Sequence, residues 1–399
     1  MFEVRRAGRH QLQTHFWAKL AIQARTLLCL QKQYSRATME NTAPNTNNFL
    51  NWVEIKNFKS IKDLRLDCKR VNVFIGKPNV GKSNILEGLG LLGAGYDTGK
   101  FLKGSVRYQN IKHLFWDNDT SLFVKVSTDR QGATLFRLPS LRVLLNDGSK
   151  SESPPSFSIR VNDETSREID GLGNLIKITH LNNELRQGDA EQRRDQLDNK
   201  LRIVKKYDFA NLTEFENSFQ GYLLPPSGVN LYEVIRRNKE LWSEFAKLFV
   251  YQQLELVLYD EKQEFILQKR NGPFVIQYPF FSIADTFRRF MFYITAIESN
   301  KNSVIVFEEP EVHSFPPYTQ EMAYRMIYDE DNQYFISTHS PYLLHTLIEN
   351  LEDSQLNVYV TYYEDYETKV KLLTPENLRE VLDFSIDVFF NLDKFLVNA

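Results

Sequence analysis

One short segment has the residue types and spacing needed to hold a phosphate group. It reads GKPNVGKSN from Gly76 to Asn84 and fits G-x-x-x-x-G-K-[ST] at Gly76, Gly81, Lys82 and Ser83. Glycines let backbone N–H groups converge on phosphate oxygens, and a following helix adds its positive N-terminal end. In this pattern the lysine reaches the β- and γ-phosphates and the serine hydroxyl coordinates Mg²⁺. The alternative is a chance match in a glycine-containing turn.

A second segment, SVIVFEEPEVHS, supplies acidic groups of the kind that triphosphate hydrolysis requires. Its apolar run, Val304 to Phe307, is followed by Glu308 and Glu309. Hydrolysis needs a carboxylate near the magnesium ion and a group that aligns the attacking water. We expect Glu308 to face the metal and Glu309 to act as the base. A solvated acidic turn after a buried strand is the alternative.

A third segment, FISTHSPYLL, places His339 at the end of another apolar run. An imidazole at a strand end next to the loop could contact the γ-phosphate, whereas a lone histidine is more often a satisfied surface or core residue. For the glycine loop as a whole, we expect nucleotide contacts from Gly76, Lys77, Pro78, Asn79, Val80, Gly81, Lys82, Ser83 and Asn84.

The elements around these segments predict an α/β fold. Residues 48–76 alternate between apolar and polar side chains as β-strands do, and NILEGLGLLG after Ser83 has the apolar spacing of a helix. Two short apolar runs near residues 303–308 and 333–338, separated by a helical segment, suit buried parallel strands. The glycine loop thus lies between a strand and a helix, as phosphate binding requires.

The middle of the chain reads as an insertion. We expect strands in 105–170, a charged helix-prone segment over 181–219, an amphipathic helix at LYEVIRRNKELWSEFAKLF, a β-meander turning at RNG, and a helix at SIADTFRRFMFYITAIES. The expected organisation is an N-terminal extension (1–48), an N-terminal lobe with the glycine loop (49–120), an α+β insertion (121–280) and a C-terminal lobe (281–399).

Composition narrows the class of protein. The 399 residues carry a net charge of −2, so any contact with nucleic acid has to come from local basic patches. Cys29 and Cys68 have no metal-ligand spacing, which favours a reduced, cytoplasmic protein. No window approaches the roughly 18 uncharged apolar residues of a membrane span. Residues 1–38 are rich in arginine, which is typical of a transit peptide, or they precede a true start at Met39; we favour the second interpretation.

Together the segments resemble the ABC-type ATPases of the SMC/RecF/OLD group. Most similar are stand-alone AAA-family ATP-binding proteins with an ABC-like head, such as those paired with nuclease or toxin subunits in bacterial defence systems. The matching pieces are IKNFKSIKDLRL, GKPNVGKSN as Walker A, VIVFEEPEVHSFP as Walker B, and FISTHSPYLL as the switch-histidine segment. The resemblance implies a P-loop NTPase head with a mixed β-sheet core flanked by helices, ATP and Mg²⁺ as ligands, Glu309 as catalytic base and His339 as switch histidine.

The sequence departs from the family pattern at two points. Glu308 stands where the family usually has aspartate. The signature motif, which in the family clamps the nucleotide of an opposite subunit, is replaced by FFSIADTFRRF; Ser282 is the candidate contact and Asp285 the expected helix cap. Gln109 is the candidate for the family's Q-loop glutamine.

Three functions follow from the resemblance. The first is an ATPase that dimerises head to head and controls a separately encoded effector or acts on DNA, in defence or repair. The second is a nuclease fused to the ATPase, against which the short acid-poor C-terminal segment argues. The third is a scaffold that binds ATP without hydrolysing it. Basic residues that could contact DNA, or form a solvated helix face, are Arg193, Arg194, Lys200, Arg202, Lys205, Lys206, Arg236, Arg237 and Lys239.

Overall fold

The computed structural model describes residues 47–96, 100–139, 142–144, 150–152, 154–162, 165–180, 203–218, 220–383 and 388–396. The chain divides into two compact units, Met1–Asn47 and Asn48–Ala399, and the second unit contains every element described below. The predicted N-terminal extension, apart from its last two residues, lies outside the described part of the chain.

A six-stranded sheet forms the centre of the second unit. Its order is β11-β15-β16-β3-β17-β18, and all neighbours are parallel except β17 and β18, which form an antiparallel hairpin. The strand that enters the glycine loop, β3, therefore lies between β16 and β17. The strands are β3 (Val71–Ile75), β11 (Val204–Tyr207), β15 (Val304–Glu308), β16 (Gln333–Ser337), β17 (Leu356–Glu364) and β18 (Glu367–Leu372).

A seven-stranded antiparallel sheet with the order β10-β9-β8-β5-β4-β1-β2 packs on the other side of the helix that follows the loop. Its strands are β1 (Trp52–Phe58), β2 (Ile61–Asp67), β4 (Val124–Thr128), β5 (Gly132–Arg137), β8 (Ser156–Val161), β9 (Thr165–Asp170) and β10 (Leu175–His180). Two smaller antiparallel sheets contain β6 (Arg142–Leu144) with β7 (Lys150–Glu152), and β12 (Glu255–Tyr259), β13 (Glu264–Asn271) and β14 (Phe274–Pro279).

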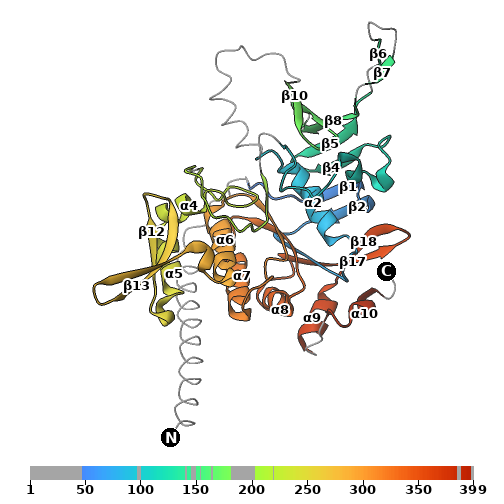
Figure 1. Cartoon of the computed structure of the whole chain (residues 1–399). Coiled ribbons are helices and arrows are strands. Elements are labelled where there is room, and N and C mark those ends of the chain that lie inside the picture. Colours follow the sequence, from blue (N-terminus) through green and yellow to red (C-terminus); the bar gives the residue numbers. More distant parts are fainter. Residues whose placement is uncertain are drawn as a thin grey trace, which may run out of the picture. The chain divides into compact units, whose positions relative to one another are not determined.

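The helices cover both faces of the central sheet. Helix α2 contacts strands of both large sheets, while α6, α7 and α8 pack in sequence on the opposite face (Figure 1). Alternate residues of β15 divide accordingly: Val304 and Val306 join the core around α2, and Ile305 and Phe307 join the core around α6. The helices are α2 (Lys82–Leu92), α4 (Leu231–Arg237), α5 (Lys239–Lys247), α6 (Asp285–Ser299), α7 (Pro316–Tyr328), α8 (Pro341–Asn350), α9 (Pro375–Asp383) and α10 (Leu392–Leu396).

The structure confirms the predicted α/β class and most of the predicted elements. The strands before the loop, the helix after it, the meander turning at Gly272 and the parallel pair β15 and β16 are all present. The strand pairings also cross the expected boundary at residue 120, because β4 pairs with β1 in one sheet.

Two expectations about the middle of the chain are wrong. The segment 181–219 was expected to be helical, but its part from Val204 to Tyr207 is strand β11, which pairs in parallel with β15; residues 181–202 lie outside the described part. The expected single helix over 231–249 is two helices, because the Asn238 side chain accepts hydrogen bonds from the N–H groups of Glu240 and Leu241 and starts a new helix there.

Among the described residues, no helix is both long enough and apolar enough to cross a membrane.

Loss of a ring from the central sheet should destabilise the fold. Phe335 on β16 is fully buried, so Phe335→Ala is expected to lower the free energy of unfolding by about 3–5 kcal/mol. Phe274→Ala, which removes the same atoms from a side chain that is 70% exposed, should change it by less than about 0.5 kcal/mol. Urea unfolding measures both, and equal losses would contradict the assignment of the core.

Candidate functional site

The loop between β3 and α2 requires glycine at both ends. Gly81 has φ 100° and Gly76 φ 153°. A Cβ atom at Gly76 would lie 2.3 Å from the carbonyl oxygen of Thr361, and one at Gly81 would lie 2.0 Å from the Thr368 hydroxyl oxygen. The loop is therefore pressed against the ends of β17 and β18, and a side chain at either position would push it away.

A chain of hydrogen bonds fastens the same loop to the β1–β2 turn and to β18. The Asn84 amide donates to the Ser60 hydroxyl at 2.6 Å, the Ser60 and Thr368 hydroxyl oxygens lie 2.6 Å apart, and the Thr368 hydroxyl donates to the Val80 carbonyl at 3.0 Å. Because Thr368 donates to Val80 and Asn84 donates to Ser60, the Ser60 hydroxyl donates to Thr368. Asn84 thus holds the loop through its side chain.

Lys82, the first residue of α2, folds back over the loop. Its Nζ donates to the carbonyl oxygens of Gly76 and Lys77, both at 2.9 Å, and the residue is 5% exposed. Burial lowers the pKa of Lys82, while the nearby carboxylates of Glu309 and Glu308 oppose that shift. Lys77 points outward to an ion pair with Asp393, with 2.7 Å between Nζ and Oδ1.

The structure brings Glu309 and His339 together at the ends of β15 and β16. The Glu309 N–H donates to the Ser337 carbonyl at 3.0 Å, and Glu309 Oε1 lies 3.5 Å from His339 Nε2. Partial burial and the charge of Lys82 lower the pKa of His339, and Glu309 opposes them. Lys82, Glu309 and His339, which are far apart in sequence, therefore act on one another electrostatically.

Glu308 is held by cations that the sequence had not singled out for this role. Its carboxylate lies 3.0 Å from Arg107 Nη2 and 3.7 Å from Lys206 Nζ. Arg107 Nε also pairs at 2.5 Å with Glu87 of α2, which is fully buried and accepts from Lys59 as well. The one signal for Glu87 was a single carboxylate within the apolar run NILEGLGLLG.

The residues present fit a nucleotide with Mg²⁺. Lys82 directs its ammonium group at loop carbonyls, where phosphate oxygens would be stronger acceptors. Within the described part of the chain no three His, Cys, Asp or Glu residues form a metal cage. Mg²⁺ commonly takes one or two protein ligands and completes its shell with phosphate oxygens and water, and Ser83 with Glu308 would supply such ligands.

The segment around Ser282 differs from its expected form. Ser282 is exposed at the end of a short 3₁₀ helix, η4 (Phe280–Ser282). Asp285 was expected to cap α6, and this is wrong: Ala284 is the N-cap residue and no side chain caps the helix. Because Asp285 occupies the first helical position, its carboxylate reaches the next turn and the facing loop, accepting from Arg289 Nε at 2.7 Å and lying 3.0 Å from His313 Nδ1.

The basic residues considered for DNA contact are only partly at the surface. Lys205 and Lys206 lie on β11 and are buried, so a solvated helix face is wrong for these two. Lys205 Nζ donates to Asn300 Oδ1 at 2.6 Å and lies 3.5 Å from the centre of the Tyr222 ring. Arg236 and Arg237 pair with Glu233. Arg193, Arg194, Lys200 and Arg202 lie outside the described residues.

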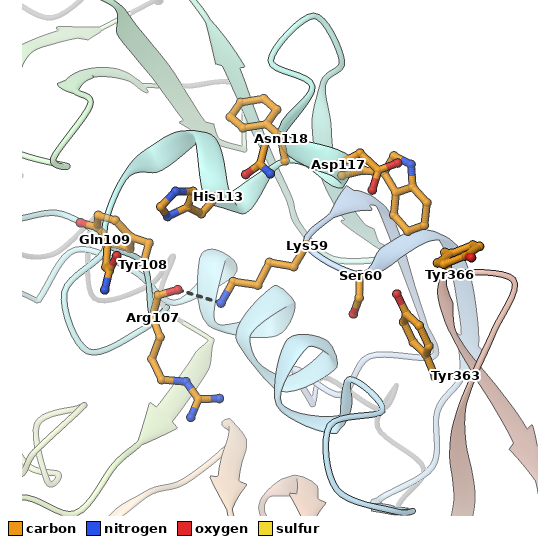
Figure 2. A pocket seen from close by; sticks show the side chains of 12 residues that line it. Lys59, Ser60, Arg107, Tyr108, Gln109, His113, Asp117, Asn118, Tyr363 and Tyr366 are labelled. Atoms are coloured by element: carbon orange, nitrogen blue, oxygen red, sulfur yellow. Dashed lines mark hydrogen bonds between the residues drawn. The ribbon is translucent and has the colours of Figure 1, made fainter.

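An open pocket of about 650 Å³ lies beside the loop (Figure 2). Ser60 and Tyr363 line one side and His113 and Gln109 the other, with Lys59 directed at the Arg107 carbonyl. The structure thus places Gln109, the candidate Q-loop residue, on the pocket wall. The remaining lining residues are Arg107, Tyr108, Phe115, Trp116, Asp117, Asn118 and Tyr366.

A protein-family model described as an AAA ATPase domain matches residues 49–264, which is more than half of the chain. The chain belongs to this family. The predicted family relationship is thereby confirmed, and membership of this family supports nucleotide binding and ATPase activity. The matched segment of the AAA ATPase domain contains the loop and α2 but ends before β15, so the roles of Glu309 and His339 rest on geometry. No curated protein matches the sequence significantly.

Solved structures similar to this AAA ATPase domain include three SMC head domains, each 12% identical. One is bound to the C-terminal winged-helix domain of ScpA (TM-score 0.44; 83% of this chain and 99% of that chain covered). Another is from Thermotoga maritima, with a TM-score of 0.35; the match covers 82% of this chain and 99% of that chain. The third, with an extended coiled coil and the C-terminal domain of ScpA derived from Pyrococcus furiosus, has a TM-score of 0.45 (84% and 98%).

Substitution of Gly81 should disrupt nucleotide binding. Gly81→Ala combines a positive φ with a Cβ atom 2.0 Å from Thr368, and a strain of roughly 1–3 kcal/mol would weaken nucleotide affinity about tenfold or more. Gly221→Ala is the matched control, because Gly221 has φ +81° but open space around its Cβ position. Titration with a fluorescent nucleotide compares them; equal affinity in both variants would contradict the proposed loop geometry.

Lys205 should make the protein more stable as the pH rises. Burial lowers the pKa of Lys205 to about 7, whereas an unfolded lysine titrates near 10.4. Between these values the unfolded chain binds more protons, so the free energy of unfolding increases with pH, by up to a few kcal/mol. Urea unfolding from pH 7 to 9 should show a smaller slope for Lys205→Met than for Lys301→Met, which alters an exposed lysine. Identical slopes would contradict this assignment.

Proposed function

We propose that this protein binds ATP with Mg²⁺ at the loop Gly76–Asn84 and hydrolyses it, with Glu309 orienting the attacking water and His339 contacting the γ-phosphate. The observation that carries the proposal is the convergence of Lys82, Glu309 and His339. The Glu309 carboxylate acts to raise the pKa of Lys82, and the charge of Lys82 lowers the pKa of the His339 imidazole, although the three residues come from separate segments.

The parallel arrangement of the strands supports these roles. Residues that follow β3, β16 and β15 lie at the same edge of the central sheet, which is where ligands bind in open α/β folds. Glu309 has φ 45°, a conformation that β-carbon sterics disfavour, and two hydrogen bonds from its N–H to Ser337 hold it there. With its backbone held in this way, Glu309 places its carboxylate 3.5 Å from His339 Nε2, and we assign this carboxylate the role of accepting a proton from water.

Mg²⁺, when bound, would neutralise phosphate charge in the transition state. Ser83 and Glu308 are the residues that would hold it. The ion pairs of Glu308 with Arg107 and Lys206 fix the direction of this carboxylate at the end of β15. Ser83 is the second residue of α2, so its hydroxyl lies at the helix end that favours anions.

We further propose that two copies close head to head around nucleotide, with Ser282 and the first turn of α6 of one copy facing the loop of the other. The state of this dimer would control a separately encoded effector or nuclease, or contact with DNA, in the cytoplasm. One observation favours a second function, a scaffold that holds ATP without hydrolysis: Asp285, a carboxylate, occupies the start of α6, where it would face the triphosphate of the other copy.

Replacement of the base should separate binding from hydrolysis. Glu309→Gln is expected to lower ATP turnover by about 10²–10⁴-fold with little change in ATP affinity, and to accumulate an ATP-bound dimer in light scattering. Lys82→Ala should instead weaken ATP binding.

Glu349→Gln, which alters an exposed carboxylate on α8, is the matched control and should behave as the unmodified protein. Unchanged turnover in Glu309→Gln would show that Glu309 is not the base. ATP binding without turnover in the unmodified protein would instead support the scaffold.

A further inference from the structure

The turn that follows β15 is fastened to the segment that carries His339. Its first residue, Glu309, donates from its N–H to the carbonyl of Ser337 at 3.0 Å. Its third, Glu311, accepts two hydrogen bonds on Oε1, from the Thr338 hydroxyl and from the His339 N–H, each at 2.7 Å. The turn and the segment are therefore joined by a backbone hydrogen bond at Glu309 and by two hydrogen bonds to the side chain of Glu311.

The second residue in this link, Thr338, extends it into α8. Thr338 is fully buried, and its hydroxyl oxygen accepts from the Ser340 N–H at 2.9 Å while donating to Glu311. Ser340 in turn caps α8 by accepting from the Leu343 N–H at 3.3 Å. The backbone of His339 is thus fixed on one side by a capped helix and on the other by the carboxylate of Glu311.

Stability alone does not account for a carboxylate at position 311. Its Oε2 is enclosed and makes no hydrogen bond among the described residues, and burial raises the pKa of Glu311. An enclosed polar atom without a partner costs stability. The side chain of Glu311 contributes two hydrogen bonds, both on Oε1. Their donors are the Thr338 hydroxyl and the N–H of His339, the residue whose imidazole faces Glu309.

We propose that Glu311 is a positioning residue for the nucleotide site, which holds the backbone of His339 so that the imidazole stays within reach of Glu309. This inference rests on the proposed ATP hydrolysis. Glu311 acts through His339, because both of its hydrogen bonds end at Thr338 and the His339 N–H. Its loss should lower the rate of the chemical step, because misplacement of a reacting group by about 1 Å can cost 10²-fold, while the loop that binds the phosphates stays intact.

The test is a double-mutant cycle. Glu311→Ala should lower kcat about 10–100-fold and change the Kd for ATP less than about threefold. Glu311→Gln, whose amide oxygen can accept both bonds, should restore kcat to within about threefold of the unmodified protein. In a His339→Ala background, Glu311→Ala should cost less than about threefold, since residues that act through one another are not additive. Glu330→Gln, on an exposed glutamate, is the control.

Several outcomes would overturn the proposal. Additive losses in the cycle would show that Glu311 does not act through His339. A Gln variant as slow as the Ala variant would assign the effect to the charge of the carboxylate. A fall in thermal stability with kcat unchanged would leave a structural role only. If Glu311→Ala does not fold, Thr338→Val removes one of the two bonds with little change of shape and should lower kcat in the same direction.

Failure of the proposed hydrolysis can be told apart from failure of this inference. Absence of turnover in the unmodified protein would refute hydrolysis, and the ratio of ATP to ADP affinity would then replace kcat as the readout. Because His339 is expected to contact the γ-phosphate, Glu311→Ala should reduce that ratio in the same way as His339→Ala. An unchanged ratio, or unchanged turnover in an active enzyme, would reject the role of Glu311.

Discussion

Parallel pairing of β3, β16 and β15 is the constraint on which the site depends. In a parallel sheet all strands end at the same edge, so a loop after β3, a histidine after β16 and two glutamates at the end of β15 are brought together without any local sequence relation. Both faces of this sheet are buried, by α2 on one side and by α6, α7 and α8 on the other, which explains the apolar residues at the centres of β3, β15 and β16.

A chain of ion pairs also holds the elements around the site together. Buried charges are tolerated when they are paired and hydrogen-bonded. Glu87 on α2 meets this requirement through Lys59 and Arg107, and Arg107 continues to Glu308 at the end of β15. A run of alternating charges thus connects the β1–β2 turn, the helix after the loop and the proposed metal-binding carboxylate. Lys82 lies near the carboxylates of Glu309 and Glu308, which oppose the effect of burial on its pKa.

Sequence reasoning succeeded where the signal is local or repeated. The strand, glycine loop and helix around Gly81 follow from residue types at fixed spacing, and the strand ends at Glu308 and Ser337 follow from apolar runs of strand length. It failed where long-range contacts decide. Strand β11 is four residues beside a charged segment, so only its pairing with β15 reveals it. Asp285 was misplaced by one position, which turns a helix cap into a partner of arginine. The ion pairs that join Glu87 to Arg107, and Arg107 to Glu308, link residues with no fixed spacing in the sequence, so no sequence pattern predicts them.

The turn after β15 has a second attachment. His313, near its far end, accepts at its carbonyl a hydrogen bond of 2.7 Å from the Thr286 hydroxyl in the first turn of α6, and its ring meets Asp285. The same few residues therefore bridge the segment Ser337–Ser340 and the start of α6. A shift of this turn cannot remain local: it has to move the start of α6 or break one of the two attachments, so the turn couples the two segments mechanically.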